Sequence, residues 1–370
     1  MKTGKLHIWV PELIAREGGI QSYSMEMVEA VVDILGPERV TVISKSDRRK
    51  ALRLRLGGKV GIYTTGNASA VVRTPMFAMI LVTAALWERP KLILSVHPHF
   101  SPVAVWLKYW RKITCWISAH GVEVWDLPNC RTKTALKKVD KILPVSQFTQ
   151  NLMVRGLDLP IERFSIIPNT YDVTKLKPGH ALEELRKRFC LKGRKVLYTL
   201  GRLEPTEQYK GIDEVISVLP QVVREIPNLV YLVGGKGADR ARLEEKARSL
   251  GLAERVIFLG FVPESEKADY YRLADLFVMP GWGEGFGIVY LESAACGVPV
   301  LGSTLDASAE VIRTAEIGEA VNPKNPEELK AAIVRMLKNP LRGPFPGLAQ
   351  YNRDTFRKRV RALMEEYWTK

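Results

Sequence analysis

The sequence predicts an α/β fold made of two doubly wound, parallel-sheet domains. Short apolar runs rich in β-branched residues alternate with longer helical patterns along the whole chain. This alternation is typical of parallel sheets that helices cover on both faces. The runs form two sets of roughly 170 residues each. With 370 residues, of which 46% are apolar, the chain can bury two cores of ordinary domain size.

The predicted elements follow from these runs and from the hydrophobic period between them. In the first set the strands are Leu6–Val10, Val40–Ser44, Val60–Thr64, Leu92–Val96, Thr114–Ser118, Lys141–Val145 and Ser165–Ile167. In the second set they are Val196–Leu200, Leu229–Val233, Val256–Leu259, Leu276–Met279 and Val298–Gly302. The helices include Ile20–Leu35, Gln147–Arg155, Ile212–Ile226, Arg240–Leu250, Glu264–Arg272 and Tyr290–Cys296. Because ligands of parallel sheets bind beyond the carboxyl ends of the strands, side chains that directly follow a strand are the first candidates for a site.

A polar segment without strand pattern separates the two sets of strands. We therefore expect an N-terminal domain at residues 1–172 and a linker at 173–194. The second domain is expected at 195–345. Residues 346–370 end in an amphipathic pattern, and we expect this C-terminal helix to return to the first domain.

The positive charge of the chain is unevenly distributed. The net charge is +15, and residues 45–112 hold 13 Lys or Arg against Asp47 and Glu88, a net +11. Such clustering indicates a surface that meets an anionic partner. The chain carries no nucleic-acid-binding signature, so nucleic acid is not expected as a partner. Residues 103–112 mix aromatics with cations as interfacial helices do, which favours an anionic membrane surface; a core helix with a solvated basic end is the equal alternative.

The expected compartment is the cytoplasm. Four cysteines without paired short spacing indicate neither a disulfide framework nor a zinc site. The first ten residues lead into a strand without a signal-peptide pattern. The longest apolar run, Met76 to Trp87, has 12 residues, which is too short to span a bilayer. If the protein binds a membrane, we expect it to attach peripherally at the inner membrane face.

Residues 279–299 carry the most informative motif of the chain. Glu284 and Glu292 flank a glycine-rich turn, Gly285-Phe286-Gly287, that leads into the predicted helix. Glycines let backbone approach a ligand closely, and a helix N-terminus offers N–H groups to anions. Carboxylates accept hydrogen bonds from sugar and ribose hydroxyls. The combination fits a nucleotide sugar; the alternative is a loop with an ordinary exposed glutamate at each end.

Two further motifs follow strands of the second set. Arg202 and Lys210 lie on either side of a loop that precedes a helix, which is an anion-binding arrangement able to stabilise a departing diphosphate. Two solvated surface cations are the alternative. Phe261 and Val262 follow the strand 256–259, where exposed backbone groups can contact a nucleobase edge.

The first set offers weaker candidates. Gly19 lies between the first strand and the first helix, where it can cradle a phosphate or an acceptor group or form a plain tight turn. His120 directly follows the strand 114–118. Only five histidines exist in the chain, which makes this position notable, although a lone histidine is more often structural. His97 and His99 follow a strand too, but nothing near them in sequence indicates a metal site.

Taken in this order, the motifs resemble the family 4 retaining glycosyltransferases of the GT-B fold, in which two Rossmann-like domains face each other across a cleft. The resemblance covers nearly the whole chain and is densest from Val196 to Leu337. The motifs that carry it are Glu284-Gly285-Phe286-Gly287 through Glu292 with Ala295-Cys296-Gly297-Val298-Pro299, Gly201-Arg202 with Lys210-Gly211, Phe258-Leu259-Gly260, Pro144-Val145-Ser146 and Ile167-Pro168-Asn169.

The resemblance implies roles for the matching positions. Glu284 is expected to hold the hydroxyls of the donor sugar, aided by the backbone from Gly285 through Phe286 and Gly287 to Ile288. Glu292 is expected to hold the ribose. Arg202 and Lys210 would neutralise the diphosphate, and Phe261 and Val262 lie where the base is bound. His120 would act near the sugar and its departing phosphate, from the N-terminal domain.

The implied activity is transfer of a hexose, with retention of configuration, from a donor of the GDP-mannose or UDP-glucose type to a hydroxyl of a glycan, lipid or small alcohol. No cofactor and no metal are expected, since the nucleotide sugar is itself a substrate. A nucleotide-sugar epimerase on the same scaffold and a non-catalytic binding module are the alternatives. The chain departs from many relatives at Leu305–Ala309, where they carry a glycine pair before the glutamate that matches Glu310, and again after Asn169.

Overall fold

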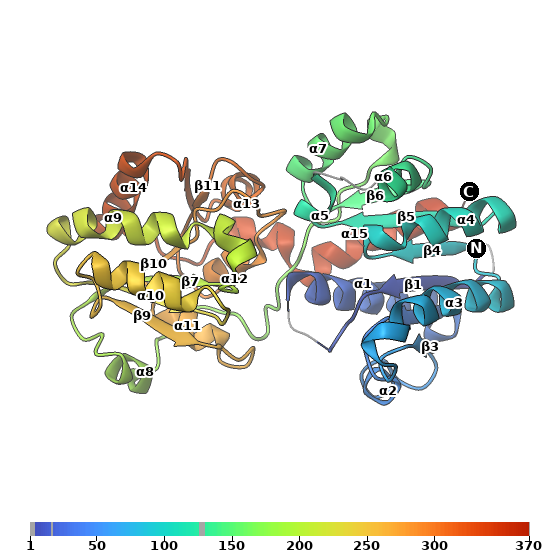
Figure 1. Cartoon of the computed structure of the whole chain (residues 1–370), viewed down its shortest axis with the longest axis horizontal. Coiled ribbons are helices and arrows are strands. Elements are labelled where there is room, and N and C mark those ends of the chain that lie inside the picture. The colour runs from blue at the N-terminus through green and yellow to red at the C-terminus, as the bar shows by residue number, and fades with distance from the viewer. Residues whose placement is uncertain (1–3, 16–17, 126–129, 370) are drawn as a thin grey trace. The chain divides into compact units, whose positions relative to one another are not determined.

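The computed structural model describes residues 4–15, 18–125 and 130–369. The chain divides into two compact units, drawn in Figure 1. The first unit runs to Thr170 and resumes at Arg353, whereas the second spans Tyr171–Asn352. The described part of each unit is built on a six-stranded sheet in which neighbouring strands are parallel.

The sheet of the first unit has the strand order β3-β2-β1-β4-β5-β6. Its strands are β1 (Leu6–Val10), β2 (Val40–Ser44), β3 (Gly61–Thr64), β4 (Leu92–Ser95), β5 (Thr114–Ala119) and β6 (Lys141–Pro144). Every residue of β1 and β2 is buried. This burial on both faces explains why these strands are nearly continuous apolar runs rather than alternating patterns.

Helices surround this first sheet. They are α1 (Gly19–Leu35), α2 (Arg49–Leu56), α3 (Ala70–Glu88), α4 (Ser101–Arg111), α5 (Val122–Trp125), α6 (Cys130–Leu136), α7 (Gln147–Leu157) and, from the end of the chain, α15 (Arg353–Thr369). The helix α15 packs beside α1, where the rings of Tyr23 and Phe356 meet edge to face at 5.8 Å. Arg353 also forms an ion pair with Glu26, N to O 2.5 Å. The final helix is thus tied to the first unit.

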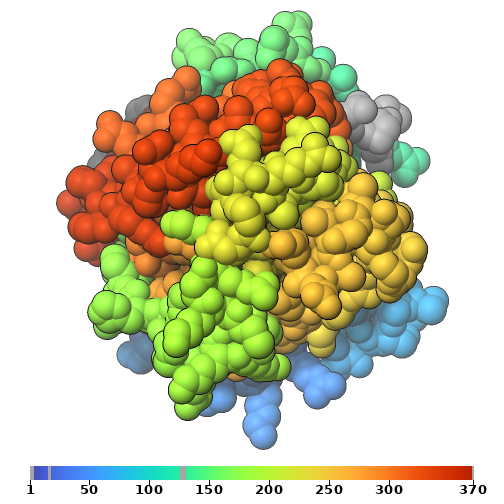
Figure 2. Space-filling view, turned by 90° about the vertical axis from the view of Figure 1, so that its left-hand side faces the viewer, coloured from blue at the N-terminus to red at the C-terminus, as the bar shows by residue number. Residues whose placement is uncertain are grey.

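The sheet of the second unit has the order β12-β11-β10-β7-β8-β9. Its strands are β7 (Lys195–Leu200), β8 (Leu229–Gly234), β9 (Val256–Gly260), β10 (Leu276–Val278), β11 (Val300–Ser303) and β12 (Gly318–Val321). Its helices are α8 (Glu183–Arg188), α9 (Ile212–Glu225), α10 (Arg240–Ser249), α11 (Lys267–Leu273), α12 (Ile288–Ala295), α13 (Ser308–Ala315) and α14 (Pro326–Lys338). Apolar residues of α9 and α14 pack into one core cluster with β7 and β8. Figure 2 shows the outer surfaces that α9, α10 and α14 present on this unit.

Both sheets have the strand order of a Rossmann fold, 3-2-1-4-5-6 when counted within each unit. In such sheets the chain reverses its direction of growth between the first and fourth strands, and a crevice opens there beyond the carboxyl ends. The reversal lies between β1 and β4 in the first unit and between β7 and β10 in the second. The predicted pair of doubly wound domains is therefore confirmed.

Some elements differ from the prediction. Residues 165–167 do not form a strand; they run beside β6 with hydrogen bonds from Ser165 to Ile142 and from Ile167 to Pro144. The strand β12 was not predicted, because its four residues contain a single β-branched side chain. The expectation that no apolar segment is long enough to span a membrane was wrong for α3. This 19-residue helix reaches that length and apolarity, although Phe77, Leu81, Ala84 and Ala85 belong to the core of the first unit.

Candidate active site

Two loops meet at the strand reversal of the second sheet. One follows β7 and the other follows β10, which are neighbours in the sheet. The loops are joined by a hydrogen bond from the Trp282 N–H to the Tyr209 carbonyl, 2.9 Å. Gly211, with φ +80°, lies so close to Pro280 that a Cβ would be 2.3 Å from its carbonyl oxygen. Only glycine fits this position, and it brings the start of α9 against the turn after β10.

Four charged side chains alternate in sign across these two loops. The Lys210 Nζ lies 2.9 Å from Glu284 Oε1 and 3.6 Å from Glu207 Oε2. The other oxygen of Glu207 is paired with the guanidinium of Arg202. Burial disfavours the ammonium charge, but Glu284, Tyr209 and Glu207 together outweigh burial and raise the pKa of Lys210 above its usual range. The structure thus brings together three of the predicted site residues, linked by a glutamate that was not predicted.

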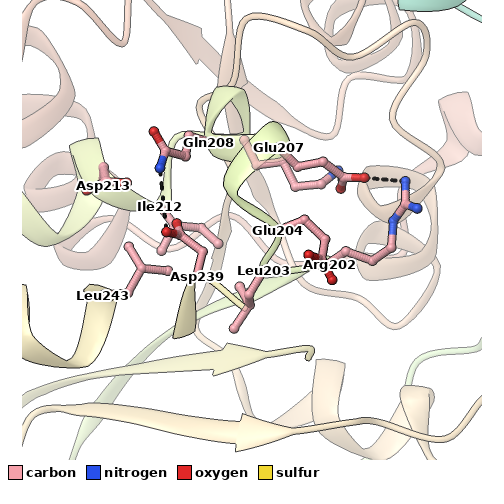
Figure 3. A pocket seen from close by; sticks show the side chains of 10 residues that line it. Arg202, Leu203, Glu204, Glu207, Gln208, Ile212, Asp213, Asp239 and Leu243 are labelled. Atoms are coloured by element: carbon pink, nitrogen blue, oxygen red, sulfur yellow. Dashed lines mark hydrogen bonds and ion pairs between the residues drawn. The ribbon is translucent and has the colours of Figure 1, made fainter. Parts of the chain in front are cut away.

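The four groups differ in their freedom to move. The side chains of Lys210 and Glu207 are 13% and 10% exposed, whereas that of Arg202 is 75% exposed. Figure 3 shows the guanidinium of Arg202 pointing to the carboxylate of Glu207. The cavity that this loop lines has a volume of about 10 Å³, room for at most one water. A ligand therefore has to meet these side chains from the outside, not from within this cavity.

The backbone of Glu284 is fixed by the loop after β11. Its N–H donates to Asp306 Oδ2, 2.9 Å, and its carbonyl accepts from the Ala307 N–H, 3.1 Å. The other carboxylate oxygen of Asp306 accepts from the N–H and the hydroxyl of Ser308, 3.0 and 2.6 Å. Burial raises the pKa of Asp306 to about 6, against the hydrogen bonds from Ser308. The segment 305–309, which departs from the family pattern, thus supplies a carboxylate that holds the turn.

The turn itself ends at Gly287, which has φ +81° and immediately precedes α12. A Cβ on Gly287 would lie 2.2 Å from the ring of Tyr290, so glycine is required here on both grounds. Gly285 and Phe286 are buried, and the Phe286 ring packs edge to face on Tyr351 at 5.6 Å. Among the described residues, no side chain accepts a hydrogen bond at the start of α12, a position where the first N–H groups of a helix lack partners within the helix.

Glu292 lies one turn further along α12 and is nearly fully buried. Lys267 Nζ contacts its two oxygens at 3.2 and 3.5 Å, and the Tyr271 hydroxyl donates to Oε2 at 2.7 Å. Burial raises the pKa of Glu292, although the charge of Lys267 and the Tyr271 hydroxyl oppose it. Both partners come from α11, so the carboxylate that was predicted to hold a ribose is oriented by a neighbouring helix.

The two residues after β9 lie in different environments. The Phe261 side chain is 52% exposed, and the Lys236 ammonium lies 5.3 Å from the centre of its ring. Val262 is buried, close to Gly234 at the end of β8. Of this predicted base-contacting pair, Phe261 is thus the side chain with a free face.

His120 and Gly19 belong to the first unit. His120 follows β5, its ring Nε2 donates to the Val96 carbonyl at 2.9 Å, and its own N–H donates to Glu123 at 2.5 Å. Burial lowers the pKa of His120 below its usual range. The imidazole is therefore held neutral with its proton on Nε2, which leaves Nδ1 as an acceptor. Gly19 is the first residue of α1.

Sequence reasoning missed one carboxylate of the first unit. Asp47 is fully buried, and its oxygens accept from the backbone N–H groups of Leu13, Ile14 and Ala15 at 2.6, 3.0 and 2.7 Å. It thereby holds the loop that leads from β1 towards Gly19. Its sequence signal, an acid in the otherwise basic segment 45–112, was read only as charge. Glu207, Lys267, Tyr271 and Asp306 were not predicted either, because they position the side chains or the backbone of other site residues and belong to no motif.

Within the described ranges, no group of three or more His, Cys, Asp or Glu side chains is arranged to hold a metal ion. His97 and His99 contact each other, with ring centres 4.6 Å apart. Burial lowers the pKa of His97 to about 3. Metal independence stays a prediction.

Two family patterns match this chain. Residues 17–175 match Glycosyltransferase Family 4, and residues 183–355 match Glycosyl transferases group 1. A GDP-mannose-dependent alpha-(1-6)-phosphatidylinositol monomannoside mannosyltransferase of Mycolicibacterium smegmatis is 32% identical over 246 residues, 63% of this chain and 63% of that protein. A D-inositol 3-phosphate glycosyltransferase of Rhodococcus opacus is 29% identical over 211 residues, 55% of this chain and 46% of that protein. The chain thus spans less than two thirds of the length of these curated relatives.

Solved structures share the fold along almost the whole chain. HepE of Anabaena in complex with UDP has a TM-score of 0.72 at 18% identity, covering 98% of this chain and 95% of that one. Sucrose-phosphate synthase of Thermosynechococcus elongatus has a TM-score of 0.73 at 20% identity, covering 98% and 96%. These likenesses show the α/β two-domain fold of GT-B type that the sequence predicts. With both halves of the chain matched in order, the protein belongs to the family 4, or group 1, glycosyltransferases.

Proposed function

We propose that this protein transfers a hexose from a nucleotide-diphosphate sugar to a hydroxyl acceptor, with retention of anomeric configuration. The observation that carries the proposal is the joined pair of loops at the β7–β10 reversal. There Arg202 and Lys210 supply positive charge, and Glu284 supplies acceptors for sugar hydroxyls. A site that recognises both a diphosphate and a polyol needs both kinds of group, since phosphates require donors and hydroxyls require acceptors.

In the proposed reaction the bond between the anomeric carbon and the diphosphate oxygen breaks, and the acceptor oxygen bonds to the same face of that carbon. The departing phosphate oxygen takes the proton of the acceptor hydroxyl. Negative charge develops on the diphosphate, where Arg202 and Lys210 stabilise it. Glu284 holds sugar hydroxyls and does not form a bond to carbon. His120, neutral and with Nδ1 free to accept, binds a sugar hydroxyl rather than acting as a fixed cation.

For the donor we propose GDP-mannose ahead of UDP-glucose. Support comes from the mycobacterial relative, whose name specifies GDP-mannose, whereas the solved relative from Anabaena binds UDP. Phe261 would face the base through its exposed ring, and Glu292 would accept from the ribose diol. Neither the ring nor the carboxylate reads the edge of the base, so both groups can hold a purine or a pyrimidine nucleotide.

For the acceptor we propose a lipid-linked alcohol at an anionic membrane surface. On α4, Trp106, Tyr109 and Trp110 are all exposed, and Arg111 lies 4.6 Å from the ring centre of Trp110. Trp87, at the end of α3, is 85% exposed. Exposed tryptophans beside cations are typical of surfaces that lie in the interface of a bilayer. Of the two readings of residues 103–112, this exposure favours the interfacial one.

The first test is a panel of nucleotide sugars with the full-length protein. GDP-mannose, UDP-glucose and other nucleotide sugars are compared by thermal shift and by their slow hydrolysis, which releases the nucleoside diphosphate. We expect one donor to stabilise the protein, and its stabilisation to be lost in Glu284→Gln. If no nucleotide sugar raises the unfolding temperature, the donor-site assignment fails.

The same assay separates the alternatives. An epimerase would change the configuration of the donor sugar without any acceptor, which NMR of the recovered nucleotide sugar detects. A non-catalytic module would bind the donor and release no nucleotide in the presence of a range of acceptor alcohols. We do not expect a non-catalytic module, because Glu284, Glu292, Arg202, Lys210 and His120 are all present. We do not expect an epimerase, because the basic residues 45–112 favour transfer to an anionic or membrane-bound acceptor.

A further inference from the structure

Both cations assigned to the diphosphate form ion pairs with carboxylates in the structure. Arg202 and Lys210 contribute two formal positive charges, and Glu207 and Glu284 contribute two negative ones, in contact along one row. The row as a whole therefore carries no net charge. A diphosphate that approached it unchanged would meet repulsion from the carboxylates beside the attraction of each cation. For the site to bind a diphosphate strongly, at least one cation has to exchange its carboxylate for a phosphate.

Arg202 is the cation that can exchange. Its side chain is 75% exposed and its partner within the row is Glu207, whereas Lys210 is 13% exposed and lies between two carboxylates. A long exposed side chain reorients at little cost, and a guanidinium binds two phosphate oxygens at once. When Arg202 turns to a phosphate, Glu207 keeps a partner, because Lys210 lies 3.6 Å from its Oε2. Glu207 is therefore never left as an unpaired buried charge.

We propose that Glu207 is a built-in counter-ion that the diphosphate displaces from Arg202, and that it thereby sets the affinity for the nucleoside diphosphate product. In the structure Glu207 pairs with both Arg202 and Lys210. After transfer, it competes with the product for Arg202 and speeds release. This inference rests on the proposed function, since it concerns the diphosphate of the same donor. Glu207 does not touch the sugar and is a positioning residue.

A purely structural role does not account for this carboxylate. Its Oε2 accepts no hydrogen bond from any described residue and contacts Lys210 as an ion pair at 3.6 Å, so a neutral side chain of similar shape would satisfy the hydrogen bonds of the loop at lower desolvation cost. Glu204, three residues earlier in the same loop, has no ion pair with either cation among the residues that the structure describes. It offers a matched control with the same charge in the same loop.

The experiment measures how tightly GDP and UDP bind to the full-length protein, by calorimetry and by product inhibition. We expect Glu207→Gln to bind the cognate diphosphate about tenfold more tightly than wild type, with a lower steady-state kcat and an unchanged single-turnover rate. Glu204→Gln should stay within about twofold of wild type. The cognate nucleoside monophosphate places less charge at Arg202, so Glu207→Gln should raise its affinity less than that of the diphosphate.

The affinities of the variants test the counter-ion role of Glu207 directly. Equal affinity in Glu207→Gln and Glu204→Gln, or weaker binding in Glu207→Gln, overturns the counter-ion role. If Glu207→Gln does not fold, Glu207→Asp, which keeps the charge but shortens the reach to Arg202, should still tighten binding relative to wild type; wild-type affinity there also overturns it. A wild-type protein that binds no nucleoside diphosphate would instead refute the proposed function.

Discussion

Lys210 and Glu284 lie 74 positions apart in the chain and 2.9 Å apart in the structure, Nζ to Oε1. They lie in the loops that follow β7 and β10, two strands that pair at the reversal of the second sheet. Their contact joins the cation proposed for the diphosphate to the carboxylate proposed for the sugar. In the proposed reaction the donor bond that breaks lies between the groups that these two residues bind, so the ion pair fixes one residue relative to the other.

Lys210→Met should therefore cost both stability and binding. It leaves Glu284 without its main cation in a largely buried position, at an expected cost of about 2–4 kcal/mol in the free energy of unfolding. Chemical denaturation measures this loss. In the double variant Lys210→Met/Glu284→Gln the cost should be smaller than the sum of the two single costs. Additive costs would show that the pair is not coupled.

The hydrogen bond from Tyr271 to Glu292 gives a second prediction. Tyr271→Phe removes the 2.7 Å donor to Oε2 and should weaken binding of the nucleoside diphosphate about 5- to 20-fold. The effect should be smaller for the 2′-deoxy diphosphate, because the carboxylate is proposed to hold the ribose diol. Tyr270→Phe, one residue earlier on the same helix α11, is the control. Equal losses for the ribose and deoxyribose ligands would assign Tyr271 to folding alone.

Asp306 should make stability depend on pH in an unusual direction. Burial raises its pKa to about 6 from 3.8, so the folded state holds the proton more tightly than the unfolded state does. Stability from this group is then greatest below about pH 4 and falls as the pH rises to about 6. The difference in unfolding free energy between wild type and Asp306→Asn should shift by about 2–3 kcal/mol, against wild type, from pH 4 to pH 7. A difference that is independent of pH would contradict the raised pKa.

The sequence motifs of the candidate site were predictable, whereas the residues that position them were not. Glu284, Glu292, Arg202 and Lys210 all sit in glycine-marked segments that follow strands, and regular strand–helix spacing located those segments. Nothing local to Asp306 points to the Glu284 N–H, 22 positions away. That contact depends on β11 pairing with β10, which only the folded sheet reveals. The short edge strand β12 was not predicted for a related reason. Its stability comes from pairing with the neighbouring strand rather than from the propensity of its own residues.

The basic segment of the first unit gives the last prediction. Reversing the charge of Arg48, Arg49 and Lys50 to Glu should weaken binding to vesicles of anionic phospholipid, since each Lys or Arg near such a surface contributes about 1 kcal/mol to the binding free energy. The consecutive cations Arg186, Lys187 and Arg188 on α8 provide a matched control with the same change of charge in the second unit. Co-sedimentation with anionic and with neutral vesicles measures the effect, beside transfer to a lipid-linked acceptor. If both triple variants bind vesicles and use the acceptor as wild type does, the membrane interpretation of residues 45–112 is removed.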